Sequence, residues 1–401
     1  MSKILTFIDY YYPAFKAGGP PQSMRNIVAR LSSEHNFWIF TSDRDLGDNS
    51  SFTNVEHDNW TAIDQASVRY TDKKLQSFCA LRRTMADVQP DIVYLNSFFS
   101  RLTIKYLVLR RLHLIPHVPT VLAPRGEFSP EVFRLKRWKK TLFIYLVRFV
   151  GLYSGLIWHA SAEHERSQII NAWRKSSRRH GSPKGASSLN IHIAPNLVAP
   201  ITTLPKKRTL KKIGGEVSLA YLSRISPNKN LLWAMNVLGH VSGNIELVIY
   251  GPIESVDYWK RCLEKIKELP EHIHVEYRES IPTSQVQDTL KQHHFFLLPT
   301  LGENFGHAIF EAMLAGCPPI ISDKTQWRDL ESQRVGWDLP LDDERAWQRT
   351  LARCVEMGQA DYDAMANNAF KFASQWASQP EVIEANANLF RLTAIKRSHL
   401  L

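Results

Sequence analysis

The sequence predicts an α/β protein made of two doubly wound domains, each with a parallel sheet between layers of helices. Signals for strands, helices and turns alternate along the whole chain, which is typical of this fold class. The length of 401 residues suits two domains of ordinary size. Residues 295–322 show the pattern most clearly, because an apolar run, a turn, an amphipathic run and a second apolar run follow one another.

Each half of the chain contains its own series of these elements. In the first half, strands are expected at 3–8, 37–40, 67–70, 91–96, 120–123, 156–159 and 191–196, with helices at 24–31, 74–88, about 137–150 and 161–169. In the second half, strands are expected at 217–222, 246–252, 274–276, 295–298 and 318–322, with helices at 256–269, 306–315, 342–358 and 361–396. A basic segment with prolines and a glycine pair, residues 197–215, reads as the linker.

Two carboxylates frame the turn of the 295–322 unit. Glu303 lies in the loop at the carboxyl end of the strand, and Glu311 lies about one turn into the helix. Ligands of open α/β sheets bind at the carboxyl ends of strands, and the N–H groups at a helix start suit a phosphate. Both glutamates could instead be solvated, but Glu311 belongs to the otherwise apolar FGHAIFEAMLAG, where a charge needs a partner. The local chemistry therefore indicates a sugar that carries phosphate.

This stretch, PTLGENFGHAIFEAMLAGCPPIISD, resembles the donor-site motif of retaining GT-B glycosyltransferases of family 4, the glycogen-synthase-like group. The resemblance implies two Rossmann-like domains that face a cleft. Residues 1–199 would bind the acceptor, residues 200–377 would bind a nucleotide sugar, and a final helix, about 378–401, would pack back on the first domain. Glu303 would bind hydroxyl groups of the donor sugar, and Glu311 would hold the ribose.

Two cations follow the first strand of the second domain. Arg224 comes soon after residues 217–222, and Lys229 stands five residues later at a helix start. Fixed positive charge stabilises the charge that develops on a departing diphosphate. The spacing resembles the G-R-x-x-x-x-K-N pattern of the same family, with Ser223 in place of glycine, whereas without that context both would be ordinary surface cations. The resemblance makes Glu303, Arg224 and Lys229 the candidate catalytic residues.

The resemblance also places backbone groups around the donor. N–H groups in the loop before the helix would help to bind the diphosphate, and the backbone near Ile281 would read the nucleobase. The loop residues concerned are Asn304, Phe305, Gly306 and His307.

Loops that follow strands of the first domain hold further candidates. Gly18 and Gly19 precede a helix, where backbone amides can approach a phosphate, although such pairs are often only turns. The resemblance places them near the donor phosphates and the acceptor. Asn96 and Ser97 end the strand 91–96, where many relatives have a histidine. They are hydrogen-bonding candidates on the acceptor side, or caps of the strand end.

Arg125 and Glu127 follow the strand 120–123 in the string PRGE. A similar P-R-G element in bacterial polysaccharide glycosyltransferases implies the acceptor side of the cleft. There Arg125 would hold an acceptor phosphate, with Glu127 paired to it. A purely structural ion pair between the two is an equal alternative.

Positive charge is concentrated in two stretches of the chain. Residues 132–148 hold six Lys and Arg residues and residues 171–215 hold ten, with no acid in either, whereas the net charge of the whole chain is +11. Such a local excess favours an anionic partner surface, although solvated loops and helix faces are the alternative.

Residues 141–158 are the one apolar stretch that approaches the length of a membrane span. Arg148 lies near its middle and glycines follow, so the stretch reads as the end of a helix, a glycine turn and a strand. With Trp138, Phe143 and Tyr145 beside its basic residues, that helix fits a membrane interface. Peripheral contact with an anionic membrane is therefore expected.

The four cysteines are scattered, which suits free thiols in a reducing compartment, and the N-terminal MSKILTFID reads as a strand rather than a signal peptide. The expected location is the cytoplasm, at the inner face of the membrane. No metal or cofactor is expected, because no D-x-D stands near a strand end and Arg224 and Lys229 supply positive charge.

These observations predict a retaining hexosyltransferase that moves a sugar from a nucleotide sugar to a lipid-linked or oligosaccharide acceptor. The resemblance and the charge suggest capsule, O-antigen or exopolysaccharide assembly. A non-catalytic sugar-nucleotide-binding or scaffold subunit is the alternative, and Asn96 motivates it. Binding of nucleic acid through residues 171–215 is disfavoured, because no aromatic residues are interleaved in the manner of known motifs.

Overall fold

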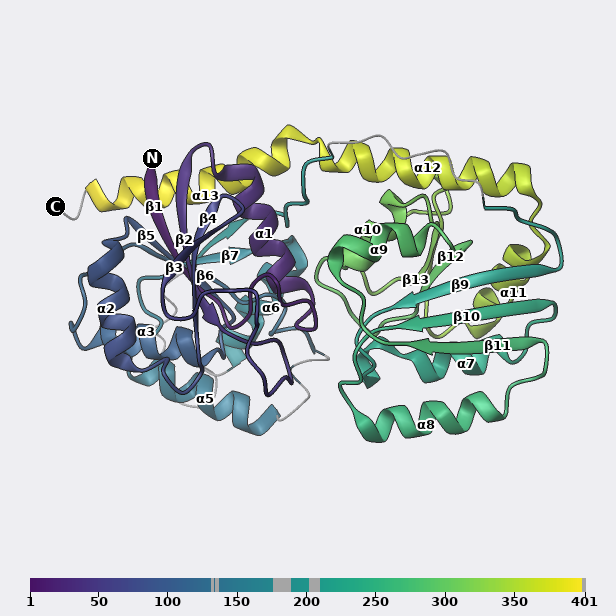
Figure 1. Ribbon diagram of the computed structural model, residues 1–401, viewed down its shortest axis with the longest axis horizontal. Helices are drawn as coiled ribbons and strands as arrows, with labels where there is room; N and C mark the ends of the chain where they lie inside the picture. Colours follow the sequence, from purple (N-terminus) through teal and green to yellow (C-terminus); the bar gives the residue numbers. More distant parts are fainter. Residues whose placement is uncertain (131–132, 134–136, 176–188, 202–209, 399–401) are drawn as a thin grey trace. The chain divides into compact units, whose positions relative to one another are not determined.

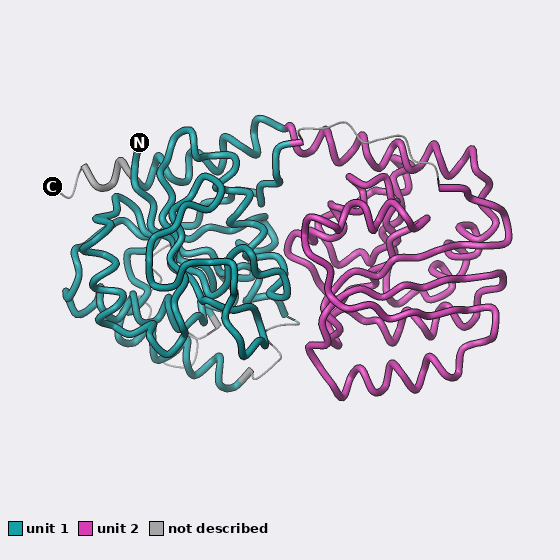
Figure 2. Tube along the Cα trace, viewed as in Figure 1, with its two compact units in different colours: residues 1–200, 379–401 teal, residues 201–378 magenta. Residues whose placement is uncertain are grey.

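The computed structural model describes residues 1–130, 133, 137–175, 189–201 and 210–398. The chain divides into two compact units (Figure 2). Unit 1 comprises Met1–Pro200 and Gln379–Leu401, and unit 2 comprises Ile201–Ser378. Each unit contains a largely or wholly parallel sheet with helices packed on it (Figure 1), so the predicted doubly wound fold class is confirmed.

The described part of unit 1 forms a sheet of order β3-β4-β2-β1-β5-β6-β7-β8, in which β3 alone is antiparallel to its neighbour. The strands are β1 (Ser2–Phe7), β2 (His35–Ser42), β3 (Trp60–Ile63), β4 (Ala66–Thr71), β5 (Ile92–Asn96), β6 (Thr120–Ala123), β7 (Ile157–Ala160) and β8 (Asn190–Ile193). The helices are α1 (Gly19–Leu31), α2 (Phe78–Val88), α3 (Arg101–Arg111), α5 (Arg137–Phe149), α6 (Glu163–Lys175) and α13 (Pro380–Ser398).

Both faces of this sheet are covered by helices. Alternate residues of a strand point to opposite faces, and Leu5 and Phe7 of β1 join one core with apolar residues of α2, α3, α5 and α6. Phe390 of α13 packs against Phe37 and Tyr94, with ring centroids 6.3 and 5.4 Å apart. The last helix of the chain is therefore part of unit 1.

The described part of unit 2 forms a parallel sheet of order β11-β10-β9-β12-β13-β14. The strands are β9 (Glu216–Leu222), β10 (Asn244–Tyr250), β11 (Ile273–Arg278), β12 (Phe295–Leu298), β13 (Pro319–Ser322) and β14 (Trp337–Leu339). The helices are η1 (Pro227–Lys229), α7 (Leu231–Leu238), α8 (Val256–Lys267), α9 (Thr283–Leu290), α10 (His307–Leu314), α11 (Glu344–Glu356) and α12 (Gln359–Ala377).

Helices α9, α10 and α12 lie on one face of this sheet, and α7 and α8 lie on the other (Figure 1). Every residue of β12 is buried. A parallel strand covered on both faces reads as a continuous apolar run rather than an alternating one, and the sequence FFLL of β12 follows this rule.

Two elements of unit 1, the short strand β3 and helix α3, were not predicted from the sequence. Apolar residues of α3, RLTIKYLVLRR, are spread around the helix, so no single apolar stripe marks it. The helix expected at 74–88 begins only at Phe78, because Ser77 caps it by accepting a hydrogen bond from Ala80 N at 3.2 Å.

The stretch 141–158 is confirmed as the end of α5, a turn and β7. Among the described residues, no helix combines the length and the hydropathy that a bilayer span requires. Much of the predicted basic loop at 174–188 and of the linker at 197–215 lies outside the described residues.

Candidate active site

The strand order of unit 2 reverses direction between β9 and β12, the point where ligands of open α/β sheets bind. Strands β9 and β12 pair directly, with β10 on one side and β13 on the other. The connection after β9 carries Arg224 and Lys229, and the connection after β12 carries Glu303 and Glu311. The fold thus gathers the four predicted side chains onto the two connections that flank this point.

Lys229 and Glu303 form an ion pair across this point. Lys229 Nζ donates a hydrogen bond to Glu303 Oε1, and the two side chains are only 10% and 17% exposed. The hydroxyl of Tyr221 donates to the Lys229 carbonyl at 3.1 Å, which fixes the backbone of the short helix η1. The loss of either partner would leave an uncompensated charge in a largely dry environment. Both residues were expected at the donor site from the sequence, but their pairing was not predicted.

Arg224 is half-buried, and its Nη1 lies 2.9 Å from Glu254 Oε1. Glu254 was not predicted from the sequence. Its position after β10 could have identified it, because polar residues that follow strands are candidates for ligand binding in this fold class. A guanidinium has five N–H donors, so Arg224 can keep Glu254 and still bind an anion.

Gly251 allows the connection after β10 to touch the one after β9. Its φ is +140°, and a Cβ there would lie 2.0 Å from the carbonyl oxygen of Ser223. Ser223 N also donates to the Tyr250 carbonyl at 3.0 Å. The close approach therefore requires glycine at 251, and a serine is accommodated at 223, where the family resemblance implies glycine.

The loop before α10 is anchored by Phe305. Its side chain is 3% exposed, its ring packs against Trp327 and Trp376 at 5.3 and 5.2 Å, and Trp327 Nε1 donates to its carbonyl at 2.7 Å. Phe305 can therefore contact a bound nucleotide sugar only through its N–H group. Asn304 and His307 beside it are half-buried at the start of α10.

Glu311 lies half-buried on α10, and no described residue donates a hydrogen bond to its carboxyl group or pairs with it. Burial raises the pKa of this carboxyl to about 8. At neutral pH it is therefore mostly uncharged in the ligand-free chain, with its hydrogen-bonding capacity unused by the described residues.

Ile281 is half-buried in the connection between β11 and α9. Because β11 is separated from β9 by β10, this connection leaves the sheet two strands away from the reversal point.

The strand order of unit 1 reverses between β1 and β5. Ser100, at the start of α3, donates from Oγ to Asp9 Oδ1 at 2.7 Å, which joins the connections after these two strands. Burial raises the pKa of Asp9. Asp9 was not predicted from the sequence, although a carboxylate so close after the first strand could have been found by the same rule that selected Asn96.

Gly18 and Gly19 lie at the start of α1, and Gly18 has a φ of +79°. The next two residues are Pro20 and Pro21, which have no N–H group. The start of α1 therefore offers an anion fewer donors than an ordinary helix N-terminus does, and those of Gly18 and Gly19 are the first available.

Arg125 does not pair with Glu127, so the ion pair considered from the sequence is wrong. Its guanidinium donates instead to Asn96 Oδ1 at 3.1 Å, Asn196 Oδ1 at 2.8 Å and the Tyr94 hydroxyl at 2.9 Å. The physical reason is that both groups are engaged elsewhere: three neutral oxygens accept from the guanidinium, and Glu127 accepts from Ser97 and from backbone N–H groups.

Glu127 links the connections after β5 and β6. Its carboxyl accepts from Ser97 Oγ at 2.6 Å and from the backbone N–H groups of Phe98 and Phe99. Burial raises its pKa to about 7, against the opposing effect of these hydrogen bonds. Ser97 has a φ of +75°, and strained residues of this kind cluster at functional sites.

The basic stretches are not uniformly solvated. Lys212 is buried, and its Nζ donates to the carbonyls of Ile213, Glu216 and Val355 at 2.7–2.8 Å. The prediction that Lys212 contributes to a surface for an anionic partner is therefore wrong, because three backbone oxygens already surround its charge. The residues of these stretches that lie outside the described ranges are Arg134, Lys136, Arg178, Arg179, Lys184, Lys206, Lys207 and Arg208.

Residues 216–357, most of unit 2, match the family model for glycosyl transferases group 1. Unit 2 therefore matches a glycosyltransferase group 1 domain. No curated protein sequence matches the chain.

Solved structures similar to the whole chain belong to GT-B glycosyltransferases. HepE of Anabaena with UDP-glucose has a TM-score of 0.67 at 15% identity, covering 98% of this chain and 99% of that chain. A trehalose-6-phosphate structure from E. coli bound with UDP-2-fluoro glucose has a TM-score of 0.67 at 10% identity, with the same coverage. WaaG, a glycosyltransferase involved in lipopolysaccharide biosynthesis, has a TM-score of 0.63 at 12% identity, covering 96% and 98%. At these identities the likeness establishes the GT-B fold.

Gly306 sets the start of α10 in the glycosyltransferase group 1 domain. Its φ is +75°, and a Cβ there would lie 2.7 Å from Ile309 Cδ1. We expect Gly306→Ala to lower the free energy of unfolding by about 1–3 kcal/mol, the range for a non-glycine residue held in a sparsely populated conformation. Thermal unfolding measures the loss.

Gly358→Ala is the matched control for this substitution. Gly358 has a negative φ, and a Cβ at this position would have no atom within 4 Å, so its replacement adds no strain and should lower the unfolding midpoint only by the small cost of alanine at the N-cap of α12. Equal midpoints for Gly306→Ala and Gly358→Ala would contradict the role given to Gly306.

Proposed function

We propose that the protein is a retaining glycosyltransferase that moves a hexose from a nucleotide sugar to a lipid-linked or oligosaccharide acceptor. The observation that carries the proposal is the ion pair of Lys229 with Glu303 at the strand reversal of unit 2, with Arg224 on the same connection as Lys229. A sheltered cation held by a carboxylate is suited to a ligand that brings both an anion and hydroxyl groups.

In this proposal, different residues of the chain bind different parts of the nucleotide sugar. Lys229 and Arg224 bind the diphosphate and stabilise the charge that develops on it as the sugar leaves. Glu303 accepts hydrogen bonds from sugar hydroxyls, and Glu311 accepts them from the ribose. The two cations supply the positive charge that a divalent metal supplies in other glycosyltransferases, so the proposed reaction needs no metal.

UDP-sugars are the first donors to consider. HepE was solved with UDP-glucose, and the E. coli trehalose-6-phosphate structure holds UDP-2-fluoro glucose. Involvement of WaaG in lipopolysaccharide biosynthesis supports placing this chain in surface-polysaccharide assembly, whether capsule, O-antigen or exopolysaccharide. On this proposal unit 1 receives the acceptor, with Asn96, Ser97 and Glu127 at the carboxyl ends of β5 and β6.

We further propose peripheral contact with the inner face of the membrane through α5. Its exposed large apolar residues fall within a stripe of about 100°, since successive residues of a helix are about 100° apart. Phe149 is 81% exposed and Trp138 is 68% exposed. Such a stripe beside lysines is typical of helices that lie in a membrane interface. The stripe residues are Trp138, Leu142, Tyr145, Leu146 and Phe149.

A thermal-shift screen against UDP-, GDP- and ADP-sugars tests the donor site. A donor at 100 times its Kd should add about 2.7 kcal/mol to the free energy of unfolding, because it binds only the folded chain. The shift should disappear in Glu311→Ala and Arg224→Ala. It should persist in Arg353→Ala, an exposed arginine of the same unit that pairs with Glu331 at 2.7 Å.

The screen also separates the two classes of function. A donor-dependent shift together with transfer or slow hydrolysis of the donor supports the enzyme. A shift without any turnover would favour the non-catalytic, sugar-nucleotide-binding subunit instead. Persistence of the shift in Arg224→Ala and Glu311→Ala would show that the donor binds elsewhere.

A further inference from the structure

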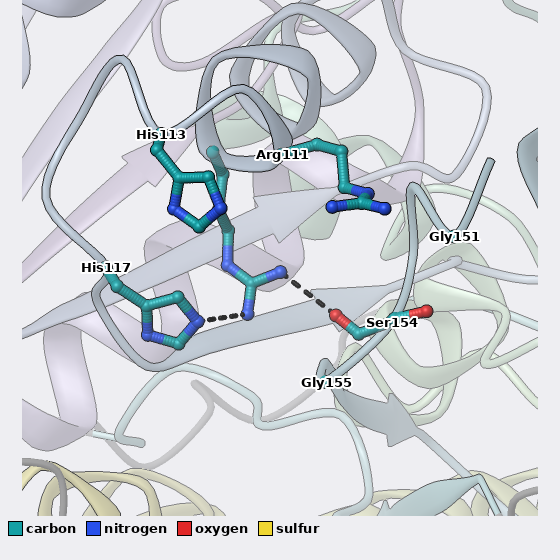
Figure 3. A pocket seen from close by; sticks show the side chains of 7 residues that line it. Arg111, His113, His117, Gly151, Ser154 and Gly155 are labelled. Atoms are coloured by element: carbon teal, nitrogen blue, oxygen red, sulfur yellow. Dashed lines mark hydrogen bonds between the residues drawn. The ribbon is translucent and has the colours of Figure 1, made fainter.

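A second cluster of cations lies in unit 1, at the amino ends of β6 and β7. The pocket there has a volume of about 400 Å³, and Figure 3 shows its lining residues. Strands β5, β6 and β7 are parallel, so this edge of the sheet is opposite the one that carries Asn96 and Glu127. The pocket is thus separate from the candidate active site. Its lining residues are Arg110, Arg111, His113, His117, Gly151, Ser154 and Gly155.

The two arginines of the pocket are only partly occupied by protein acceptors. Arg110 donates to the Ser154 carbonyl at 3.0 Å and contacts His117 Nε2 at 3.0 Å, and its buried Nε has no partner among the described residues. Arg111 donates from Nε to the Val150 carbonyl at 3.0 Å. Its two terminal amino groups have no acceptor in the described part of the chain, and the side chain is exposed.

Arg110 fixes the tautomer of His117. A guanidinium carries only donors, so His117 Nε2 must accept from Arg110 and the proton of the neutral ring lies on Nδ1. Figure 3 shows His113 and His117 on one side of the pocket and Ser154 and Gly155 on the other. Gly151 and Gly155 have left-handed backbones, and a Cβ at Gly155 would lie 3.4 Å from Arg110 Nη2.

No acid balances these donors. None of the lining residues is Asp or Glu. The sequence has no Asp or Glu between Asp91 and Glu127, nor between Glu131 and Glu163, and these two stretches supply all of the pocket. A pocket of this size that holds two guanidinium groups and no carboxylate is complementary to an oxyanion.

The exposed apolar stripe of α5 ends two residues before Gly151 of the pocket. Val150, whose carbonyl binds Arg111, directly follows Phe149, the last residue of the stripe. Leu112 and Leu114, which flank His113 in the chain, are 60% and 48% exposed. Apolar side chains that border a cationic pocket match a phospholipid, whose phosphate stands next to its acyl chains.

We propose that this pocket binds the phosphate of an anionic phospholipid while α5 lies in the interface of the same membrane. The proposal rests on the membrane contact of α5 proposed above. Arg110 and Arg111 bind the phosphate oxygens, His113 and the Ser154 hydroxyl add donors beside them, and His117 holds Arg110 in place. The pocket thereby fixes which way unit 1 faces on the bilayer, with the carboxyl ends of β5 and β6 at the opposite edge of the sheet.

The pocket is tested with a lipid that needs no bilayer. Dihexanoyl phosphatidic acid is titrated below its micelle concentration, and the ring resonances of His113 and His117 are followed by NMR. We expect saturable shifts of these two histidines, and binding at least about tenfold weaker in Arg111→Ala, because a charge-assisted contact to phosphate is lost. Lys139→Ala removes the same charge from the exposed part of α5 outside the pocket and should change the affinity by less than about twofold.

Inorganic phosphate distinguishes the lipid from a free anion. It should bind at least about tenfold more weakly than the short-chain lipid, because it lacks the apolar part that the bordering leucines and Phe149 contact. Equal affinities would overturn the lipid assignment. Absence of any histidine shift with the lipid, or equal affinities of Arg111→Ala and the unaltered protein, would overturn the pocket.

Vesicle flotation separates this proposal from the membrane contact of α5. With vesicles that contain phosphatidic acid, Leu146→Ser/Phe149→Ser should abolish flotation, and Arg111→Ala should reduce it more than Lys139→Ala does. A protein that binds the short-chain lipid but does not float would retain the pocket and overturn the contact of α5. Flotation that Arg111→Ala and Lys139→Ala reduce equally would retain the contact and overturn the pocket.

Discussion

Replacing Lys229 by methionine is expected to lower kcat/KM by at least about 10²–10³, because it removes a preorganised charge from the departing diphosphate. The same change should lower the free energy of unfolding by about 3 kcal/mol, since it leaves the Glu303 carboxylate sheltered and unpaired. Stability is measured by urea unfolding, and activity is measured with the donor that the thermal-shift screen identifies.

The double variant Lys229→Met/Glu303→Gln tells the two effects apart. Replacement of both partners leaves no uncompensated charge, which is the main cost of breaking a buried ion pair on one side only. We therefore expect the double variant to regain most of the lost stability and none of the lost activity. Lys324→Met is the control, because Lys324 is about half exposed and pairs with Asp323 at 2.9 Å in the same unit. Recovery of activity together with stability would contradict a direct role of Lys229 in the reaction.

The βαβ unit around the donor motif shows what a sequence of this kind predicts well. Strand β12 and helix α10 are found within one residue of their expected bounds. Buried parallel strands give continuous apolar runs and surface helices give a periodic stripe, so both are local signals. Helix α3 lacks such a stripe, and it was missed for that reason.

Partners that are distant in the sequence could not be predicted in the same way. Lys229 and Glu303 are 74 residues apart, and they meet because β9 and β12 pair. The sequence suggests Glu127 as the partner of Arg125, its near neighbour, whereas the guanidinium donates to Asn196, 71 residues away. The site residues could be predicted because they follow strands directly in the sequence. The hydrogen bonds between them could not, because these depend on strand order and loop conformation.

Lys212 shows that charge patterns in the sequence also do not predict long-range contacts. A run of basic residues in a linker predicts solvated cations. Three backbone carbonyls converge on its Nζ, one of them the carbonyl of Val355, 143 residues away in the sequence. Carbonyl dipoles of the fold solvate this charge in place of water, which no count of Lys and Arg residues can reveal.

Binding of a nucleotide sugar is expected to release up to about one proton at pH 7, and Glu311 is the source. Its pKa is about 8 in the ligand-free chain, because burial disfavours the charged form. Ribose hydroxyls that donate to the carboxylate favour the charged form and lower this pKa, so the proton leaves as the donor binds. Calorimetry with UDP-glucose in two buffers of different ionisation enthalpy counts the released protons, since the phosphates of that donor do not titrate near pH 7.

Glu311→Gln should bind the donor more weakly and release no proton. Its stability gives an independent measurement with a definite sign. The pKa of Glu311 is raised from 4.5 to about 8 on folding, so the folded chain holds the extra proton between these pH values and becomes less stable as pH rises through them. Glu311→Gln removes this contribution, so its advantage over the unaltered protein in urea unfolding should grow from pH 5 to pH 8. If the advantage grows but proton release is the same in both proteins, Glu311 is an acid of the fold that does not contact the ribose.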